Sequence, residues 1–158
     1  MGRAIDRSLR ISQSTAKVTE ETQAPLSNLA AVVIVAAVLG FLSITLPPYI
    51  IPGKKLVAYE APLFPFIRTA IENLSISPTA GLLVFSGGVI GYLKPQKWRL
   101  LGFSTIVLFP IASIAELIVD PTSHNLWPLE FFIYGMLSIP AILGALVGSK
   151  LKILFFGK

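Results

Sequence analysis

The chain has 158 residues, of which 54% are hydrophobic and 13% are charged. Soluble domains contain about 25% charged residues, so this composition indicates a protein surrounded by lipid and argues against a water-soluble domain. The absence of cysteine excludes disulfides, thiolate catalysis and cysteine-bound metal clusters, and a single histidine argues against a haem held by two imidazoles.

The first 25 residues are polar and basic, and we expect them to form a cytoplasmic tail. A hydrophobic segment at about 26–51 follows, and it is long enough to cross a membrane, because about 20 helical residues span the hydrocarbon layer. Ser27 or Asn28 suits its N-cap, and Pro47-Pro48 is expected to end it. No small-x-small cleavage site follows the run, so we predict a retained span and not a signal peptide.

A short amphipathic helix is expected in the loop between Gly53 and Ser77. Phe66, Ala70 and Leu74 recur at four-residue spacing, and Pro65 suits the first helical position. The residues of the opposite side are polar: Arg68, Thr69, Glu72 and Asn73. Such a helix would either form a lid over the ends of the spans or offer a docking surface to a partner.

Three further hydrophobic segments of about spanning length follow, at about 78–93, 100–119 and 128–149. The second span is the shortest, with Ser77 as its expected N-cap, and Pro110 and Pro140 are expected to kink the third and fourth spans. Core helices of a soluble protein would need polar outer faces, which these segments lack. The predicted fold is therefore all-α, a bundle of four transmembrane helices, with a basic-apolar interfacial tail at 150–158.

Two pairs of glycines have the spacing that lets membrane helices approach closely. Gly87 and Gly91 in the second span are four residues apart, as are Gly144 and Gly148 in the fourth. Small residues at this spacing favour tight packing within the chain or contacts between copies of it.

The net charge of +5 is distributed unevenly between the two predicted sides of the membrane. Ten basic residues fall on one side: Arg3, Arg7, Arg10, Lys17, Lys94, Lys97, Arg99, Lys150, Lys152 and Lys158. Only Lys54, Lys55 and Arg68 fall on the other. The positive-inside rule therefore predicts that both termini are cytoplasmic, in a multi-pass protein of the plasma membrane. Basic charge is explained by topology and contact with the lipid bilayer, and no nucleic-acid partner is expected.

The segment 116–130 is the most polar part of the second half, with three of the eight acidic residues and the only histidine. Glu116 and Asp120 share a helix face, and His124 and Glu130 follow closely enough to join them. A set of carboxylates and imidazole can bind zinc, manganese or iron, or transfer protons. The alternative is a polar clamp between the third and fourth spans, although Glu116 lies inside the apolar run, where an acid suggests function.

Motifs for nucleophilic catalysis and for nucleotide binding are missing, so we expect neither enzyme activity nor a cofactor. The preferred interpretation is a non-catalytic subunit or scaffold of a membrane complex, or a homo-oligomer. The alternative is a small transporter, channel or ion-binding protein that uses Glu116, Asp120, His124 and Glu130. A membrane enzyme with a metal at the same place is a third interpretation.

Overall fold

The computed structural model describes residues 29–122 and 127–157, and these contain helices but no strand. Four helical segments in this part are long and apolar enough to cross a membrane: Leu29–Ile50, Ile76–Leu93, Pro95–Val119 and Pro128–Phe156. The predicted all-helical fold with four helices long enough to cross a membrane is thereby confirmed, and these helices support a multi-pass membrane protein. The predicted N-terminal tail and His124 lie outside the described residues. The chain from Val33 onward forms one compact unit, and the contacts below belong to it.

The first helix, Leu29–Ile50, continues through Pro47 and Pro48, which the sequence predicts to end it. A proline removes its own N–H from the hydrogen-bond ladder and its ring crowds the carbonyl one turn earlier, but its own carbonyl group remains an acceptor. The carbonyl of Pro47 accepts a hydrogen bond from the N–H of Ile51 at 3.2 Å. The helix therefore ends only after Ile50, and Gly53, at φ +76°, turns the chain into the following loop.

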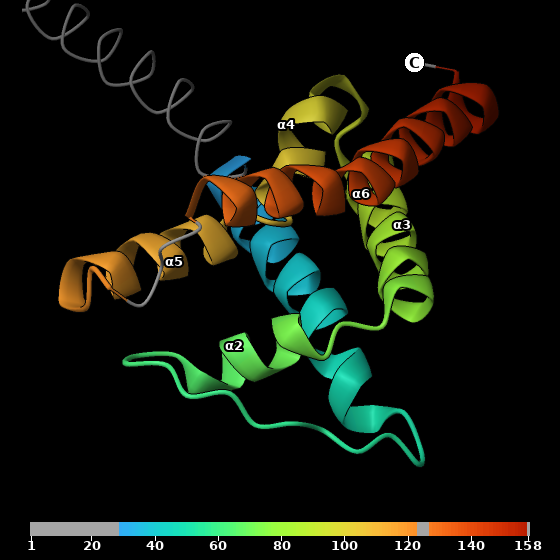
Figure 1. Ribbon diagram of the computed structural model, residues 1–158. Coiled ribbons are helices and arrows are strands. Elements are labelled where there is room, and N and C mark those ends of the chain that lie inside the picture. The colour runs from blue at the N-terminus through green and yellow to red at the C-terminus, as the bar shows by residue number, and fades with distance from the viewer. Residues whose placement is uncertain (1–28, 123–126, 158) are drawn as a thin grey trace, which may run out of the picture. The chain divides into compact units, whose positions relative to one another are not determined.

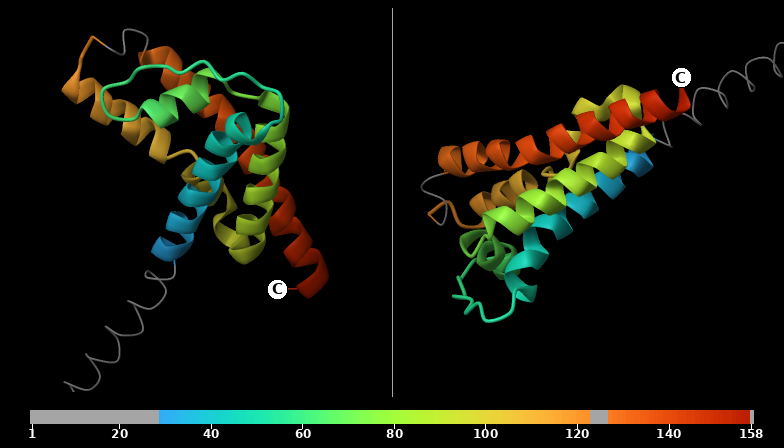
Figure 2. Two further views of the ribbon diagram at one scale, coloured as in Figure 1. Left: turned by 90° about the horizontal axis from the view of Figure 1, so that it is seen from below. Right: turned by 90° about the vertical axis from the view of Figure 1, so that its right-hand side faces the viewer.

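Helix α2, Pro65–Glu72, lies at one end of the long helices (Figure 2) and begins at the predicted proline. Its inner side chains, Ile67 and Ile71, pack against the hydrophobic core. Two hydrogen bonds hold the preceding loop at the end of α2. The side-chain amide of Asn73 accepts one from the N–H of Val57 at 3.2 Å and donates the other to the carbonyl of Val57 at 2.8 Å. Helix α2 and the loop therefore form an ordered layer over the core.

Helices α3, Ile76–Leu93, and α6, Trp127–Phe156, run beside each other (Figures 1 and 2). The N-cap of α3 is Ser75, so the prediction of Ser77 is wrong, and the hydroxyl of Ser75 accepts a hydrogen bond from Lys54 at 2.9 Å. Helix α6 contains Pro140 and continues to Phe156, through most of the segment expected to be an interfacial tail.

The backbones of α3 and α6 are in direct contact at four glycines. A Cβ atom built on Gly87, Gly91, Gly144 or Gly148 would lie 2.0 Å from a carbonyl oxygen of the other helix. The carbonyl groups belong, in that order, to Ala141, Ala145, Val84 and Gly88. The two glycine pairs thus lie opposite each other within one chain, where no side chain would fit.

The third span is interrupted. It consists of a 3-10 turn, Pro95–Lys97, helix α4, Trp98–Ser104, and helix α5, Leu108–Val119. The sequence predicts one helix kinked at Pro110, whereas the structure has a turn at residues 105–107. Because Pro110 has no N–H to donate to the carbonyl of Ile106, the N–H of Phe109 donates to it instead at 3.0 Å, which tightens the chain.

The first helix packs directly against this interruption. A Cβ atom built on Gly40 would lie 2.0 Å from the carbonyl oxygen of Thr105. The Thr105 hydroxyl donates to the carbonyl of Gly102 at 2.7 Å, so the threonine side chain satisfies one of the backbone groups around the turn. Thr105 and Ile106 are buried at this contact, whereas Val107 is 38% exposed. Burial against protein is what makes non-helical backbone tolerable within a membrane.

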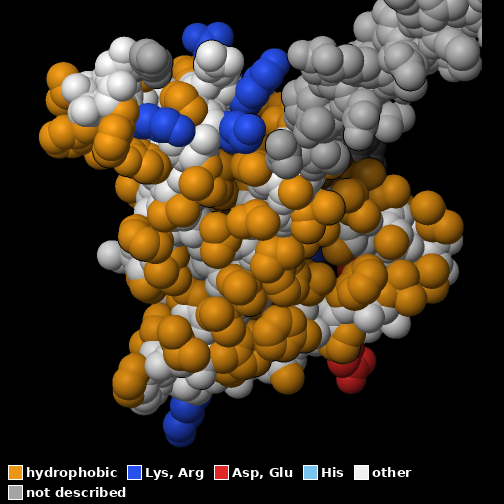
Figure 3. Space-filling view, turned by 180° about the vertical axis from the view of Figure 1, so that it is seen from behind, with side chains coloured by type: hydrophobic (Ala, Val, Ile, Leu, Met, Phe, Trp, Pro, Cys, Tyr) orange, Lys and Arg blue, Asp and Glu red, His pale blue; other side chains and the backbone are white. Residues whose placement is uncertain are grey.

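On the face that Figure 3 shows, hydrophobic side chains cover the middle, and lysine and arginine side chains gather mainly at one end. Several large apolar residues are almost fully exposed, among them Ile118 (77%) and Ile76 (76%). A surface of this kind is stable in contact with lipid tails and is an aggregation hazard in water.

Candidate functional site

The carboxylate of Glu116 is buried near the C-terminal end of α5. The residue is only 4% exposed, and Oε1 accepts a hydrogen bond from the N–H of Phe64 at 2.9 Å. Phe64 immediately precedes α2, so its N–H has no acceptor within that helix. Glu116 thus connects the start of α2 to α5.

The carboxylate of Glu130 connects α2 to α6. Its Oε1 accepts a hydrogen bond from Nη1 of Arg68 at 2.7 Å, and the second guanidinium nitrogen lies 2.8 Å from Glu72. Partial desolvation opposes the charge of Arg68, but the hydrogen bond to Glu130 and the two carboxylates raise its pKa above the ordinary value. The guanidinium therefore stays charged at neutral pH.

Two buried hydroxyl groups complete the connection between α5 and α6. The hydroxyl oxygens of Ser113 and Tyr134 are 2.8 Å apart, and Ser113 also donates to Oε2 of Glu130 at 3.4 Å. We call the set Arg68, Ser113, Glu116, Glu130 and Tyr134 the polar clamp. It joins α2, α5 and α6 at one end of the molecule.

Two of the four predicted site residues thus belong to the polar clamp. A third, Asp120, forms the turn after α5, where its Oδ1 accepts from the N–H of Thr122 at 3.0 Å and from its hydroxyl at 2.6 Å. The fourth, His124, lies outside the described residues. Within residues 29–122 and 127–157, no three histidine or acidic side chains lie close enough to hold a metal ion.

The sequence prediction missed Arg68, Ser113 and Tyr134. Helical periodicity placed Arg68 on the polar side of α2 and suggested no further role. A signal was present, because a carboxylate near hydrocarbon requires a cation, and few basic residues fall on the predicted outer side of the membrane. Helical spacing also carried a signal, because Ser113 precedes Glu116 by three residues and Tyr134 follows Glu130 by four. The polar residues of α5 and α6 therefore share faces that point to the same place.

The interior of the polar clamp is nearly filled. The space between Arg68, Ser113, Glu116 and Tyr134 measures about 10 Å³, which is room for about one water molecule and not for a hydrated ion. A larger hollow of about 410 Å³ lies outside, bounded by Arg68, Glu72, Glu130, Tyr134 and apolar residues of α6 and of the segment 71–74. Chemically, the clamp is suited to holding α2 in place, and the hollow offers one charged wall to a solute.

Comparison with known proteins adds no relative to this picture. No family model matches the chain, and neither a curated protein nor a solved structure does.

Proposed function

We propose that this chain is a non-catalytic membrane protein that serves as a subunit or scaffold of a larger membrane assembly, or as a homo-oligomer. The polar clamp carries the proposal. Its charged groups contact one another and the backbone, as in a structural joint, and the space between them is too small for a substrate. The clamp fixes α2, and α2 is the element that we propose a partner contacts.

The outward side of α2 and its loop has the composition of an interaction surface. The rings of Tyr49 and Phe66 are stacked with centroids 4.6 Å apart, and the Tyr49 hydroxyl donates to the carbonyl of Phe66 at 3.1 Å. Large apolar and aromatic side chains of the loop before α2 are exposed as well, namely Val57, Tyr59 and Leu63. Exposed aromatic and aliphatic groups on an ordered frame are typical of protein interfaces.

Native mass measurement of the full chain, extracted in mild detergent, tests this proposal. We expect oligomers or a stoichiometric co-purifying membrane protein, and Phe66→Ser is expected to reduce that species severalfold. The matched control is Phe155→Ser, which changes an exposed phenylalanine near the end of α6. A strictly monomeric wild-type chain without a partner would contradict the proposal.

A second candidate function is ion or solute transport, which the hollow beside Arg68 and Glu130 favours. Glu116→Gln separates the two candidates, because glutamine keeps an oxygen acceptor for the N–H of Phe64 but removes the charge. If Glu116 belongs to a structural joint, we expect Glu116→Gln to fold about as well as the wild type. Liposomes that contain either protein should then show no more proton or cation flux than empty liposomes. Wild-type flux above that of empty liposomes would establish transport instead, and loss of that flux in a folded Glu116→Gln protein would place Glu116 on the path.

We further propose a plasma-membrane location with both termini in the cytoplasm. The basic residues of the turn after α3 and of the end of α6 support it, because the hydroxyl of Ser149 donates to the carbonyl of Pro95 at 3.0 Å and so brings these two regions together. The positive-inside rule assigns such a basic end to the cytoplasm.

A further inference from the structure

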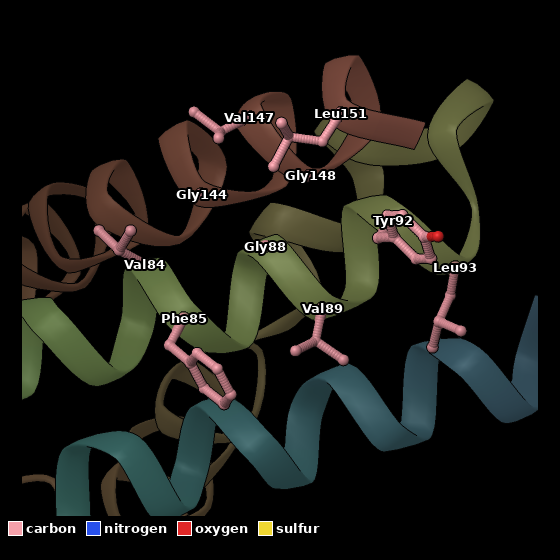
Figure 4. Close-up of a pocket in the computed structure, with 10 residues that line it drawn as sticks. All are labelled: Val84, Phe85, Gly88, Val89, Tyr92, Leu93, Gly144, Val147, Gly148 and Leu151. Carbon is pink, nitrogen blue, oxygen red and sulfur yellow. The ribbon is translucent and has the colours of Figure 1, made fainter. Parts of the chain in front are cut away.

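A long groove follows the contact between α3 and α6 (Figure 4). The groove is open along its length and has a volume of about 370 Å³, which is within the range of ligand sites in proteins. Its walls are apolar side chains from both helices: Val84, Phe85, Val89, Val147 and Leu151. Gly88, Gly144 and Gly148 form its floor.

The groove exists because of the glycines. The close approach of the two backbones requires residues without side chains at Gly144 and Gly148, so nothing rises from the floor between the walls. The position of a side chain on Gly88 is open, because a Cβ atom built there would make only an ordinary van der Waals contact, at 3.7 Å from the carbonyl oxygen of Gly144. An apolar groove on a membrane-spanning surface excludes water and is filled by hydrocarbon or by another helix.

One end of the groove is positively charged. Nζ of Lys152 lies 5.7 Å from the centre of the Tyr92 ring and donates to the carbonyl of Leu93 at 3.4 Å, and both Tyr92 and Leu93 line the groove. The end of α6 meets the turn after α3 at the bond from Ser149 to Pro95, so further basic residues are close by: Lys94, Lys97, Arg99 and Lys150. Residues 76–115 and 131–158 contain no acidic side chain to offset these charges.

We propose that the groove binds an anionic phospholipid, with one acyl chain lying over the glycine floor and the phosphate beside Lys152 and the Tyr92 hydroxyl. The apolar walls match the acyl chain, and the basic end matches the headgroup in sign. Basic pockets between membrane helices on the cytoplasmic side bind acidic headgroups by the same chemistry.

A second copy of the chain fits the groove less well than a lipid. Copies inserted in the same orientation would bring their basic ends together, and like charges repel. Copies inserted in opposite orientations would place one basic end on the wrong side of the membrane. An anionic lipid instead neutralises the charge and fills the groove.

Native mass spectrometry of the full chain, titrated with dioleoylphosphatidylglycerol or dioleoylphosphatidylcholine, tests the headgroup part. The two lipids have the same acyl chains, and we expect tighter retention of the anionic one. Lys152→Gln should weaken phosphatidylglycerol binding about fivefold, since a lysine at an anionic surface contributes about 1 kcal/mol, and should leave phosphatidylcholine unchanged. The control is Lys150→Gln, about 200° around α6 from Lys152, which should have a smaller effect. Equal retention of the two lipids, or equal effects of the two substitutions, would overturn this part.

Gly88→Leu tests the groove itself, because its side chain would occupy the place of the acyl chain. We expect retention of both lipids to fall at least tenfold. Gly81→Leu is the matched control on the same helix, since no atom lies within 4 Å of a Cβ at that position. Unchanged lipid retention in Gly88→Leu would overturn the proposal. A wild-type dimer that Gly88→Leu dissociates would also overturn it, because the groove would then hold a second copy of the chain. Circular dichroism checks that both glycine variants are folded. If Gly88→Leu does not fold, the comparison of Lys152→Gln with Lys150→Gln decides whether the groove binds the lipid.

Discussion

Replacing Gly87 by alanine is expected to destabilise the protein by about 2–3 kcal/mol, which is the effect of overpacking a tight interface. The new methyl group would lie 2.0 Å from the carbonyl oxygen of Ala141 and would also meet the backbone carbon behind it at 2.8 Å. These are backbone atoms, which cannot rotate away as a side-chain end can. The helices α3 and α6 would have to separate, and thermal unfolding in detergent, followed by circular dichroism, measures the loss.

The control for this prediction is Gly81→Ala in the same helix. A Cβ atom at Gly81 meets nothing within 4 Å, so alanine there should be neutral or stabilising by about 0.5–1 kcal/mol, because it restricts the unfolded chain and favours the helix. The same contrast is available in α6, where Gly144 contacts the backbone of α3 and Gly135 has open space. Similar stability changes in both members of a pair would contradict the direct contact between α3 and α6.

Features that depend on neighbouring residues could be predicted from the sequence. The length of an apolar run sets the number of spanning helices, and Pro65 marks the beginning of α2 because proline suits the first turn. The glycine pairs could also be recognised, because their four-residue spacing is a local pattern. Their partner helix could not, since Gly87 and Ala141 are far apart in the chain.

Features that depend on distant residues could not be predicted. The hydrogen bond from Arg68 to Glu130 joins residues 62 positions apart, and the one from Phe64 to Glu116 joins residues 52 apart. The role of Gly40 could not be predicted either, because it depends on contact with Thr105, a distant residue in the turn between α4 and α5. The turn at 105–107 could not be predicted either. Its hydrogen bonds rearrange around Pro110, and its backbone is packed against the first helix, which is distant in the chain.

Replacing Arg68 by methionine is expected to destabilise the attachment of α2 by about 2–3 kcal/mol, below the value for a fully buried pair because both side chains retain some exposure. Methionine keeps most of the side-chain volume but removes the cation from Glu130, whose side chain is only 15% exposed. Hydrogen exchange should show the effect locally: the amides of α2 lose protection, whereas those of α3 and α6 at the glycine contacts keep it.

Glu72→Gln is the control, because Glu72 contacts the same guanidinium from an exposed position in the same helix. An exposed pair four residues apart contributes about 0.2–0.5 kcal/mol, so this variant should be close to wild type. The double variant Arg68→Met, Glu130→Leu should be more stable than Arg68→Met alone, since it removes the carboxylate along with its cation. If Arg68→Met costs no more than Glu72→Gln, the pair does not hold α2, and the partner surface that we assign to α2 loses its physical basis.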